Sequence, residues 1–171
     1  MALVESAAAG MAAIAKGATL VRLRAPSASA REQERALEQL VATVDVPVIA
    51  SSRIDLALAA GAAGVHLGET DIATADARQL APAGLLVGRS VHSLEAARAA
   101  AHEGADYVLY GPIWATPTHP NRNGVGLDSL RAVALAIRPL PVLAVGGVDE
   151  TRAERVMRSG AAGWAAIRMY S

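Results

Sequence analysis

One pattern recurs four times along the chain and limits the folds that it can adopt. Each time, a Gly-Ala turn follows an alanine-rich stretch typical of a helix and leads into a short apolar run. The four segments are GATLVRL at 17–23, GAAGVHL at 61–67, GADYVLY at 104–110 and GAAGWAAI at 160–167. Glycine is the usual residue after a helix end, and a continuous apolar run is typical of a strand buried on both faces. The pattern therefore predicts helices that alternate with buried parallel strands.

Three more apolar segments between these repeats complete the predicted sheet. They are VPVIA at 46–50, LLVGRS at 85–90 and PVLAVGG at 141–147. Helix signals separate the strands: Ser29 to Glu32 has the form of a capping box, and Asp149 is suited to cap a last helix. Such alternation indicates a parallel sheet covered by helices. We count seven strands and six helices between them, with one more helix over residues 1–15.

Seven strands suit either an open doubly wound sheet or an incomplete TIM (βα)8 barrel. The sequence begins inside the predicted helix at 1–15 and ends directly after a strand. We therefore expect one domain over residues 1–171, a TIM-type barrel that lacks its first strand and its last helix. In such a barrel the strands at 17–23 and 160–167 would have unpaired edges. Because unpaired edges favour association, we also expect a homodimer.

Composition excludes several classes of protein. With 53% hydrophobic and 19% charged residues, the chain has ample apolar surface for a folded core. Its formal net charge of zero argues against nucleic-acid binding, and the absence of cysteine excludes disulfides and thiolate metal sites. No window of about 18 residues is apolar enough for a membrane span, and the segment before Ala15 carries Glu5 and lacks the basic region of a signal peptide. We expect a cytoplasmic protein without nucleic-acid or membrane partners.

Ordered motifs along most of the chain resemble a known family. They are SSRIDLALAAGAAGVHLGETD at 51–71, VGRSVHSLEAA at 87–97, ADYVLYGPIWATPT at 105–118 and PVLAVGGV at 141–148. From about residue 10 to 170 the chain resembles the thiamine phosphate synthase/TenI superfamily, and most closely its TenI branch. The family fold is a TIM barrel, so the resemblance favours the barrel over an open sheet.

The resemblance implies one of two reactions on phosphorylated thiamine precursors. The synthase joins a hydroxymethylpyrimidine diphosphate to a thiazole phosphate with the help of magnesium. The TenI-type tautomerase aromatises a carboxythiazole phosphate by moving a proton, without a metal. Residues that differ from the synthase pattern distinguish the two.

Where the synthase pattern reads Val-Gln-Leu-Arg-x-Lys, this chain has VRLRAP at 21–26. Of the two cations in the pattern, only the arginine is kept, as Arg24. Arg22 stands at the position of the glutamine. Ser51 and Ser52 stand at the synthase's Asn-Asp pair, and only Asp71 matches a metal-binding aspartate. One carboxylate is a poor magnesium site. Our main prediction is therefore a TenI-like, metal-independent tautomerase with no cofactor, acting on a small phosphorylated thiazole. Asp71 would bind magnesium only if the chain were a synthase.

The general base is not obvious from the resemblance. The tautomerase's catalytic histidine corresponds to Pro112, which cannot move a proton. His119 follows in the same loop, where a barrel presents its active site, and imidazole titrates near neutral pH. We predict His119 as the catalytic residue.

Other residues are predicted to bind substrate. Gly146 and Gly147 end a strand and offer backbone N–H groups to a phosphate, with Arg168 on the neighbouring strand. The remaining candidates are Arg24, Ser90, Thr116 and Thr118. By contrast, His66 alternates with apolar neighbours inside a strand, which favours a buried histidine with its hydrogen bonds satisfied.

Two alternatives to the tautomerase stay open. One is a magnesium-dependent thiamine phosphate synthase. The other is a non-catalytic ligand-binding or regulatory protein that keeps the barrel, which the lost Lys and Asp positions and Pro112 favour.

Overall fold

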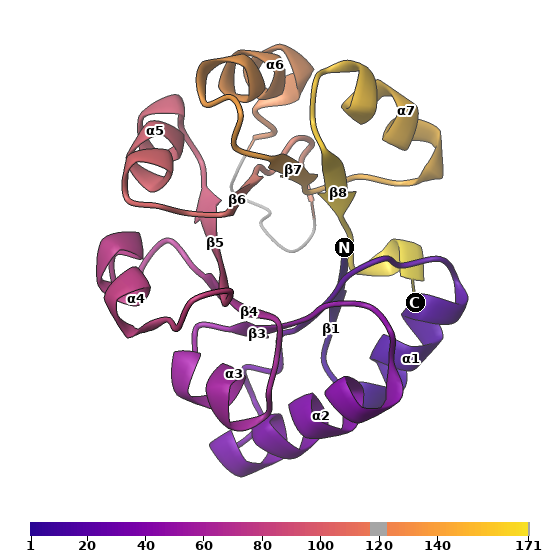
Figure 1. The fold of residues 1–171 in the computed structure, drawn as a ribbon. Coiled ribbons are helices and arrows are strands. Elements are labelled where there is room, and N and C mark those ends of the chain that lie inside the picture. The colour runs from indigo at the N-terminus through magenta and orange to yellow at the C-terminus, as the bar shows by residue number, and fades with distance from the viewer. Residues whose placement is uncertain (117–122, 171) are drawn as a thin grey trace.

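The chain forms a ring of parallel strands with helices on the outside (Figure 1). The computed structural model describes residues 1–116 and 123–170, with Arg168 placed by its backbone alone. The eight strands pair in sequence order, each parallel to the next: β1 Ala2–Val4, β2 Val21–Leu23, β3 Val48–Ser51, β4 Gly64–Leu67, β5 Leu86–Val91, β6 Tyr107–Tyr110, β7 Val142–Val145 and β8 Gly163–Ala165. This arrangement confirms the predicted TIM-type α/β barrel.

Seven α-helices within the described residues connect the strands and cover their outer face. They are α1 Ala7–Ala15, α2 Ala30–Thr43, α3 Ile54–Ala59, α4 Thr74–Leu80, α5 Leu94–His102, α6 Gly126–Ala136 and α7 Glu150–Arg158, and a short 3-10 helix spans Arg168–Tyr170. The capping signals act as predicted. Ser29 and Glu32 form a reciprocal capping box at α2, and Asp149 caps α7 by accepting from Arg152 N at 3.0 Å. No helix in these described ranges is long and apolar enough to cross a membrane.

The predicted absence of a first strand is wrong. Ala2–Val4 forms β1, and the helix expected over residues 1–15 begins only at Ala7. Ala2 N donates to Leu20 O at 2.8 Å, and Leu3 N donates to Ala166 O at 3.0 Å, so β1 joins β2 to β8. Three residues directly before an alanine-rich helix give no strand periodicity, so only these pairings define β1. Because they occupy the edges of β2 and β8, the homodimer loses the reason for which it was predicted.

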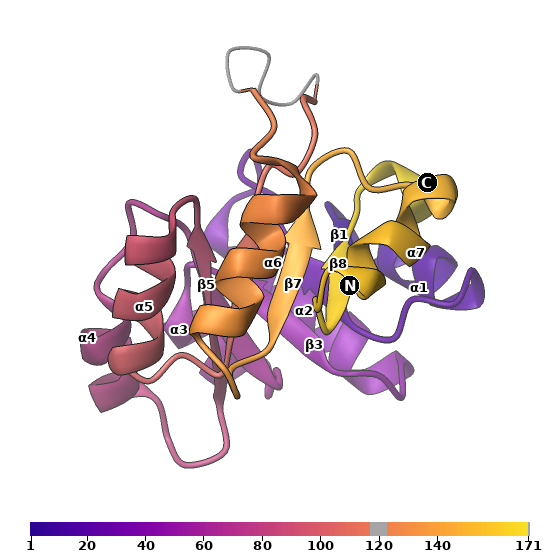
Figure 2. The same ribbon diagram turned by 90° about the horizontal axis from the view of Figure 1, so that it is seen from above.

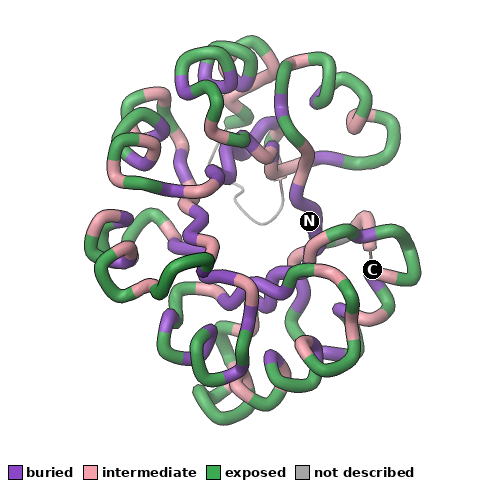
Figure 3. The backbone as a smooth tube through the Cα atoms, viewed as in Figure 1, coloured by how far each residue is buried: buried purple, intermediate pink, exposed green. Residues whose placement is uncertain are grey.

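Small aliphatic side chains fill the space on both sides of the sheet. Figure 3 shows buried residues along the strands and exposed residues on the outer helix faces. Inside the ring lies a cluster of inward-facing side chains: Met1, Leu3, Leu20, Tyr107, Leu109, Leu143, Val145 and Ala165. Two larger clusters fill the layer between strands and helices. The barrel is therefore a packed core, and only its ends are available to a ligand.

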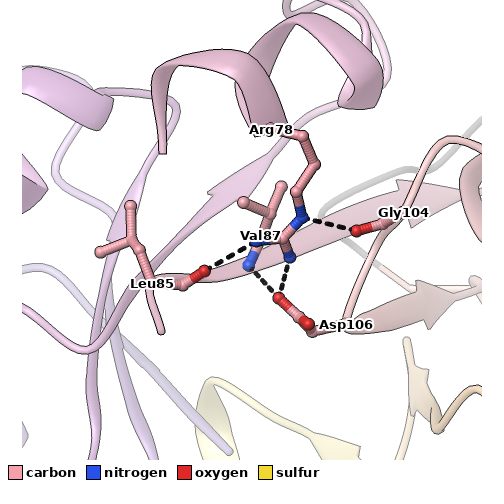
Figure 4. A network of polar contacts seen from close by, with 5 residues as sticks. All are labelled: Arg78, Leu85, Val87, Gly104 and Asp106. Carbon is pink, nitrogen blue, oxygen red and sulfur yellow. Dashed lines mark hydrogen bonds and ion pairs between the residues drawn. The ribbon is translucent and has the colours of Figure 1, made fainter. Parts of the chain in front are cut away.

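A polar network holds β5 and β6 together at their amino ends (Figure 4). Arg78 of α4 donates to Gly104 O at 2.7 Å and to Leu85 O at 2.9 Å, and it forms an ion pair with Asp106. Asp106 also accepts from Val87 N at 2.7 Å. In TIM barrels this end serves stability, and function belongs to the carboxyl ends of the strands. At that opposite end, the segments that lead from β6 towards α6 rise above the strands (Figure 2).

Candidate active site

A row of polar side chains crosses the inside of the barrel, from the last residue of β3 to the first residue of β6. Because side chains alternate along a strand, the register decides which residues share a level. Ser51 pairs with His66, His66 with Gly88, and Gly88 with Tyr107, on the four neighbouring strands β3 to β6. The row therefore places a hydroxyl, an imidazole and a phenol on neighbouring strands inside the barrel.

His66 connects two of these groups by hydrogen bonds. Its Nδ1 lies 3.1 Å from Tyr107 Oη, and its Nε2 lies 2.9 Å from Ser90 Oγ. Gly88 makes the contact possible, since a Cβ at this position would lie 2.5 Å from Tyr107 Oη and 2.6 Å from His66 Nδ1. The structure thus confirms the predicted buried, hydrogen-bonded histidine, and it places Ser90 at the outer end of the chain of hydrogen bonds.

Burial keeps both ring systems uncharged at neutral pH. Desolvation, helped by the positive charges of Arg22 and Arg89, lowers the pKa of His66 well below its usual 6.5. Desolvation also raises the pKa of the Tyr107 phenol. Neutral histidine offers one N–H and one acceptor nitrogen, so Tyr107, His66 and Ser90 form a continuous relay in either tautomer. Ser90 Oγ is therefore oriented by His66.

Arg22 places a cation beside this row. Its side chain is only 6% exposed, and Nε donates to Ser51 Oγ at 2.8 Å. Ser51 Oγ in turn donates to Leu23 O at 2.6 Å. Burial lowers the pKa of Arg22 to about 10, which leaves it protonated at neutral pH. From the sequence, Arg22 was interpreted only as a departure from the synthase pattern. Because side chains alternate along a strand, its two-residue spacing from Leu20 and Arg24 indicates that Arg22 faces inward as well.

The described residues do not assemble a magnesium site of their own. Asp71 Oδ2 accepts from Gly68 N at 2.6 Å, and Ser51 is engaged by Arg22 and Leu23. Over residues 1–116 and 123–170, no three His, Cys, Asp or Glu side chains are grouped to hold a metal. Mg²⁺ prefers several oxygen ligands, so Asp71 as a single carboxylate does not fit a protein-held magnesium ion.

Gly146 and Gly147 form a tight turn at the end of β7. Both have positive φ values, 92° and 70°, which glycine adopts without strain. A Cβ at Gly146 would lie 2.6 Å from Pro112 Cα, and a Cβ at Gly147 would lie 2.7 Å from Trp114 Cβ. Neither backbone N–H donates to a group in the described part of the chain. The turn therefore presents two N–H donors that an anion can use.

The remaining predicted site residues lie apart from this row or outside the described residues. Arg24 is exposed directly after β2, and Thr116 is partly buried at the end of the segment that follows β6. Thr118 and His119 lie outside the described residues, as does the side chain of Arg168. The structure therefore leaves the catalytic role predicted for His119 untested.

Comparison with known proteins assigns the chain to a family. The family described as thiamine monophosphate synthase, TMP-TENI, matches residues 3–170. The chain belongs to this family. Its sequence is 44% identical over 160 residues to the thiamine-phosphate synthase of Chloroflexus aurantiacus, covering 91% of this chain and 73% of that protein. It is 45% identical over 159 residues to that of Anaeromyxobacter dehalogenans, covering 88% and 69%.

A solved structure agrees with this assignment. The thiamine phosphate pyrophosphorylase from Pyrococcus furiosus superposes with a TM-score of 0.89 at 31% identity, covering 99% of this chain and 86% of that one. These relatives contradict the tautomerase that we predicted as the main function. The prediction gave most weight to the altered residues at 21–26 and 51–52, whereas proteins named synthases share 44% and 45% of their aligned residues with this chain. The similarities support the synthase alternative.

Proposed function

We propose that this protein is a thiamine phosphate synthase, a transferase that joins a hydroxymethylpyrimidine diphosphate to a thiazole phosphate. The observation that carries the proposal is the 44% identity to a named synthase over 91% of the chain. The site supports it, because polar side chains and free N–H donors gather at one end of the barrel. The proposed ligands are small phosphorylated molecules, and a cytoplasmic location stays a sequence-based prediction.

The chemistry requires a departing anion to be stabilised. The bond between the pyrimidine methylene carbon and the diphosphate oxygen breaks, and its electron pair leaves with the diphosphate. The lone pair of the thiazole nitrogen forms the new carbon–nitrogen bond, which gives the thiazolium product without a proton transfer. Donors that are fixed in place before the reaction lower the barrier most where charge develops on the leaving group.

Three groups of this chain are suited to that task. Ser90 Oγ, held by His66 at 2.9 Å, can donate to a phosphate oxygen. Arg24, directly after β2, contributes an exposed cation. The N–H groups of Gly146 and Gly147 suit the thiazole phosphate, because barrel enzymes often bind phosphate after strand 7. Binding this remote phosphate would orient the thiazole nitrogen towards the methylene carbon.

A magnesium ion is implied by the family but does not fit the residues described here. Asp71 is its one matching carboxylate, and a hydrogen bond from Gly68 already engages it. The proposed reaction therefore relies on the chain's own donors and cations. Thr116, Thr118 and Arg168 remain proposed substrate-binding residues.

The test is to measure thiamine phosphate and released diphosphate together, by chromatography, with both substrates present. We expect equal amounts of the two products from the wild type. Ser90→Ala should lower kcat/KM by about tenfold, the effect of losing one hydrogen bond to a charged group. Ser159→Ala, which removes an exposed hydroxyl after α7, should leave the rate unchanged.

One result would refute the proposed function, and another would refute only the role of Ser90. Tight binding of both substrates without any condensation would favour the non-catalytic ligand binder. A Ser90→Ala variant as active as Ser159→Ala would remove Ser90 from the site, even if the wild type were a synthase.

A further inference from the structure

Hydrogen bonds to its carbonyl groups hold the Gly146–Gly147 turn against the segment that follows β6. Ile113 N donates to Val145 O at 2.8 Å, and Trp114 N donates to Gly146 O at 3.1 Å. In a trans peptide group the C=O and the following N–H point in opposite directions. These two bonds therefore direct the N–H groups of Gly146 and Gly147 away from that segment.

Arg152 of α7 fixes the next peptide group of the turn. Its Nη1 donates to Gly147 O at 2.7 Å. Adjacent glycines have more backbone freedom than other pairs of residues, so their N–H groups keep one direction only when neighbours hold the peptide groups on both sides. Trp114 N holds the group before Gly147, and Arg152 holds the group after it.

The Trp114 ring keeps the Arg152 side chain in place. The guanidinium carbon Cζ lies 4.8 Å from the centroid of the ring, within the range of a cation–π contact. Asp149 adds a weaker constraint, because its Oδ2 lies 3.8 Å from Arg152 Nε. A planar guanidinium can stack on a ring and donate a hydrogen bond in its own plane at the same time, which the ammonium group of lysine cannot match. Arginine is therefore suited to hold the turn from the face of a tryptophan.

We propose that Arg152 and Trp114 are positioning residues, which hold the Gly146–Gly147 turn in the conformation that binds the phosphate of the thiazole substrate. The inference rests on the proposed synthase function, which assigns this phosphate to the turn. Neither side chain has to touch the ligand, because Arg152 acts through Gly147 O and Trp114 acts through Arg152. Since the turn is ordered before the ligand arrives, binding does not have to supply that order.

The first test measures the affinity for each substrate separately by calorimetry, with thiazole phosphate and pyrimidine diphosphate as the two ligands. Arg152→Met keeps a long side chain but removes the charge and the donors. It should weaken thiazole phosphate binding about tenfold, because ordering the backbone of one residue costs about that much in affinity. Its affinity for pyrimidine diphosphate should stay within about twofold of the wild type. The melting temperature without ligand checks that the variant folds.

Turnover separates positioning from a direct part in the chemistry. The phosphate of the thiazole is remote from the new carbon–nitrogen bond and keeps its charge, so the turn binds it equally in the ground state and in the transition state. Arg152→Met should therefore raise the KM for thiazole phosphate about tenfold and leave kcat within about twofold. Arg152→Lys keeps the charge but loses the stacked, planar donor, so its KM should fall between those of the wild type and Arg152→Met.

Two further variants test the contact itself. Arg155→Met is the matched control: Arg155 lies on the same helix with its Cζ 6.0 Å from the same ring, but among the described residues it makes no hydrogen bond to the turn. This variant should bind thiazole phosphate as the wild type does. Trp114→Leu removes the ring beneath Arg152. Added to Arg152→Met, it should weaken binding little further, because the two residues act through one contact.

Several results would overturn the inference. If Arg152→Met kept its affinity for thiazole phosphate, Arg152 would not support the turn, and the synthase proposal would stand if turnover persisted. An Arg152→Lys variant equal to the wild type, or an Arg155→Met variant as weak as Arg152→Met, would mean that charge alone accounts for the effect. Equal weakening of both substrates would indicate general damage to this end of the barrel. Losses that add in the double variant would separate Trp114 from Arg152. Thiazole phosphate binding that depends on Arg152, in a wild type without turnover, would instead preserve the positioning role and refute the synthase.

Discussion

Buried His66 should make the folded protein lose stability when the pH falls below 6.5. The unfolded chain exposes His66 with its ordinary pKa of 6.5, whereas burial lowers its pKa in the folded state. A group with a lowered folded pKa binds its proton more readily in the unfolded chain. Acid therefore favours unfolding, and the contribution of His66 is complete only above about pH 7.

The magnitude follows from one proton. If folded His66 stays neutral down to pH 5, linkage from pH 7 to pH 5 removes about 2 kcal/mol from the free energy of unfolding. Urea denaturation at a series of pH values measures this loss. His66→Gln removes the titrating ring and should reduce the loss by about 2 kcal/mol, while its stability at pH 7 falls as well.

A matched control tests whether replacing a different histidine has the same effect on the pH dependence of stability. His102→Gln changes an exposed histidine at the end of α5 and should leave the pH dependence as in the wild type. In addition, the ring protons of His66 should show no titration in NMR spectra of the folded protein between pH 7 and 5. A wild type and a His66→Gln variant with the same pH dependence, or a ring that titrates near 6.5, would refute the reasoning.

Three other predictions concern the barrel. Gly88→Ala places a methyl group 2.5 Å from Tyr107 Oη and should lower stability by about 3 kcal/mol in urea denaturation. Adding Tyr107→Leu should restore part of the lost stability. A double variant with no restored stability would argue against a clash between the two side chains. Arg78→Met removes three partners and should cost about 2 kcal/mol. In the same assay Arg98→Met, on the exposed face of α5, should stay within about 0.5 kcal/mol. Leu3→Pro removes the N–H that bonds to Ala166 O, directly after β8, so it should lower stability by about 3 kcal/mol and promote association detectable by light scattering. A stable monomer would contradict the role given to β1.

Sequence patterns predicted the barrel well because the strand signals are local. The Gly-Ala turns precede β2, β4, β6 and β8, and Ser29 caps α2 as its motif indicated. β1 was missed because three apolar residues without a preceding turn carry no periodicity. Its identity depends on pairing with β2 and β8, which are distant in the sequence.

The site was less predictable because its contacts cross the barrel. Ser90 was singled out, but its orientation depends on His66 from β4, and the contact of His66 with Tyr107 depends on the missing side chain of Gly88. Arg22 could be placed inward by alternation, yet its hydrogen bond to Ser51 emerges only from the three-dimensional arrangement. The choice of reaction failed for another reason, since substituted metal ligands were taken as evidence against the transferase.

The most direct test of the proposed function offers the wild-type protein each reaction separately. One mixture contains the pyrimidine diphosphate and the aromatic thiazole phosphate, and the other contains only the unaromatised carboxythiazole phosphate. We predict that the first mixture yields thiamine phosphate and diphosphate in equal amounts, while the second stays unchanged. Aromatisation in the second mixture with no condensation in the first would contradict the synthase assignment.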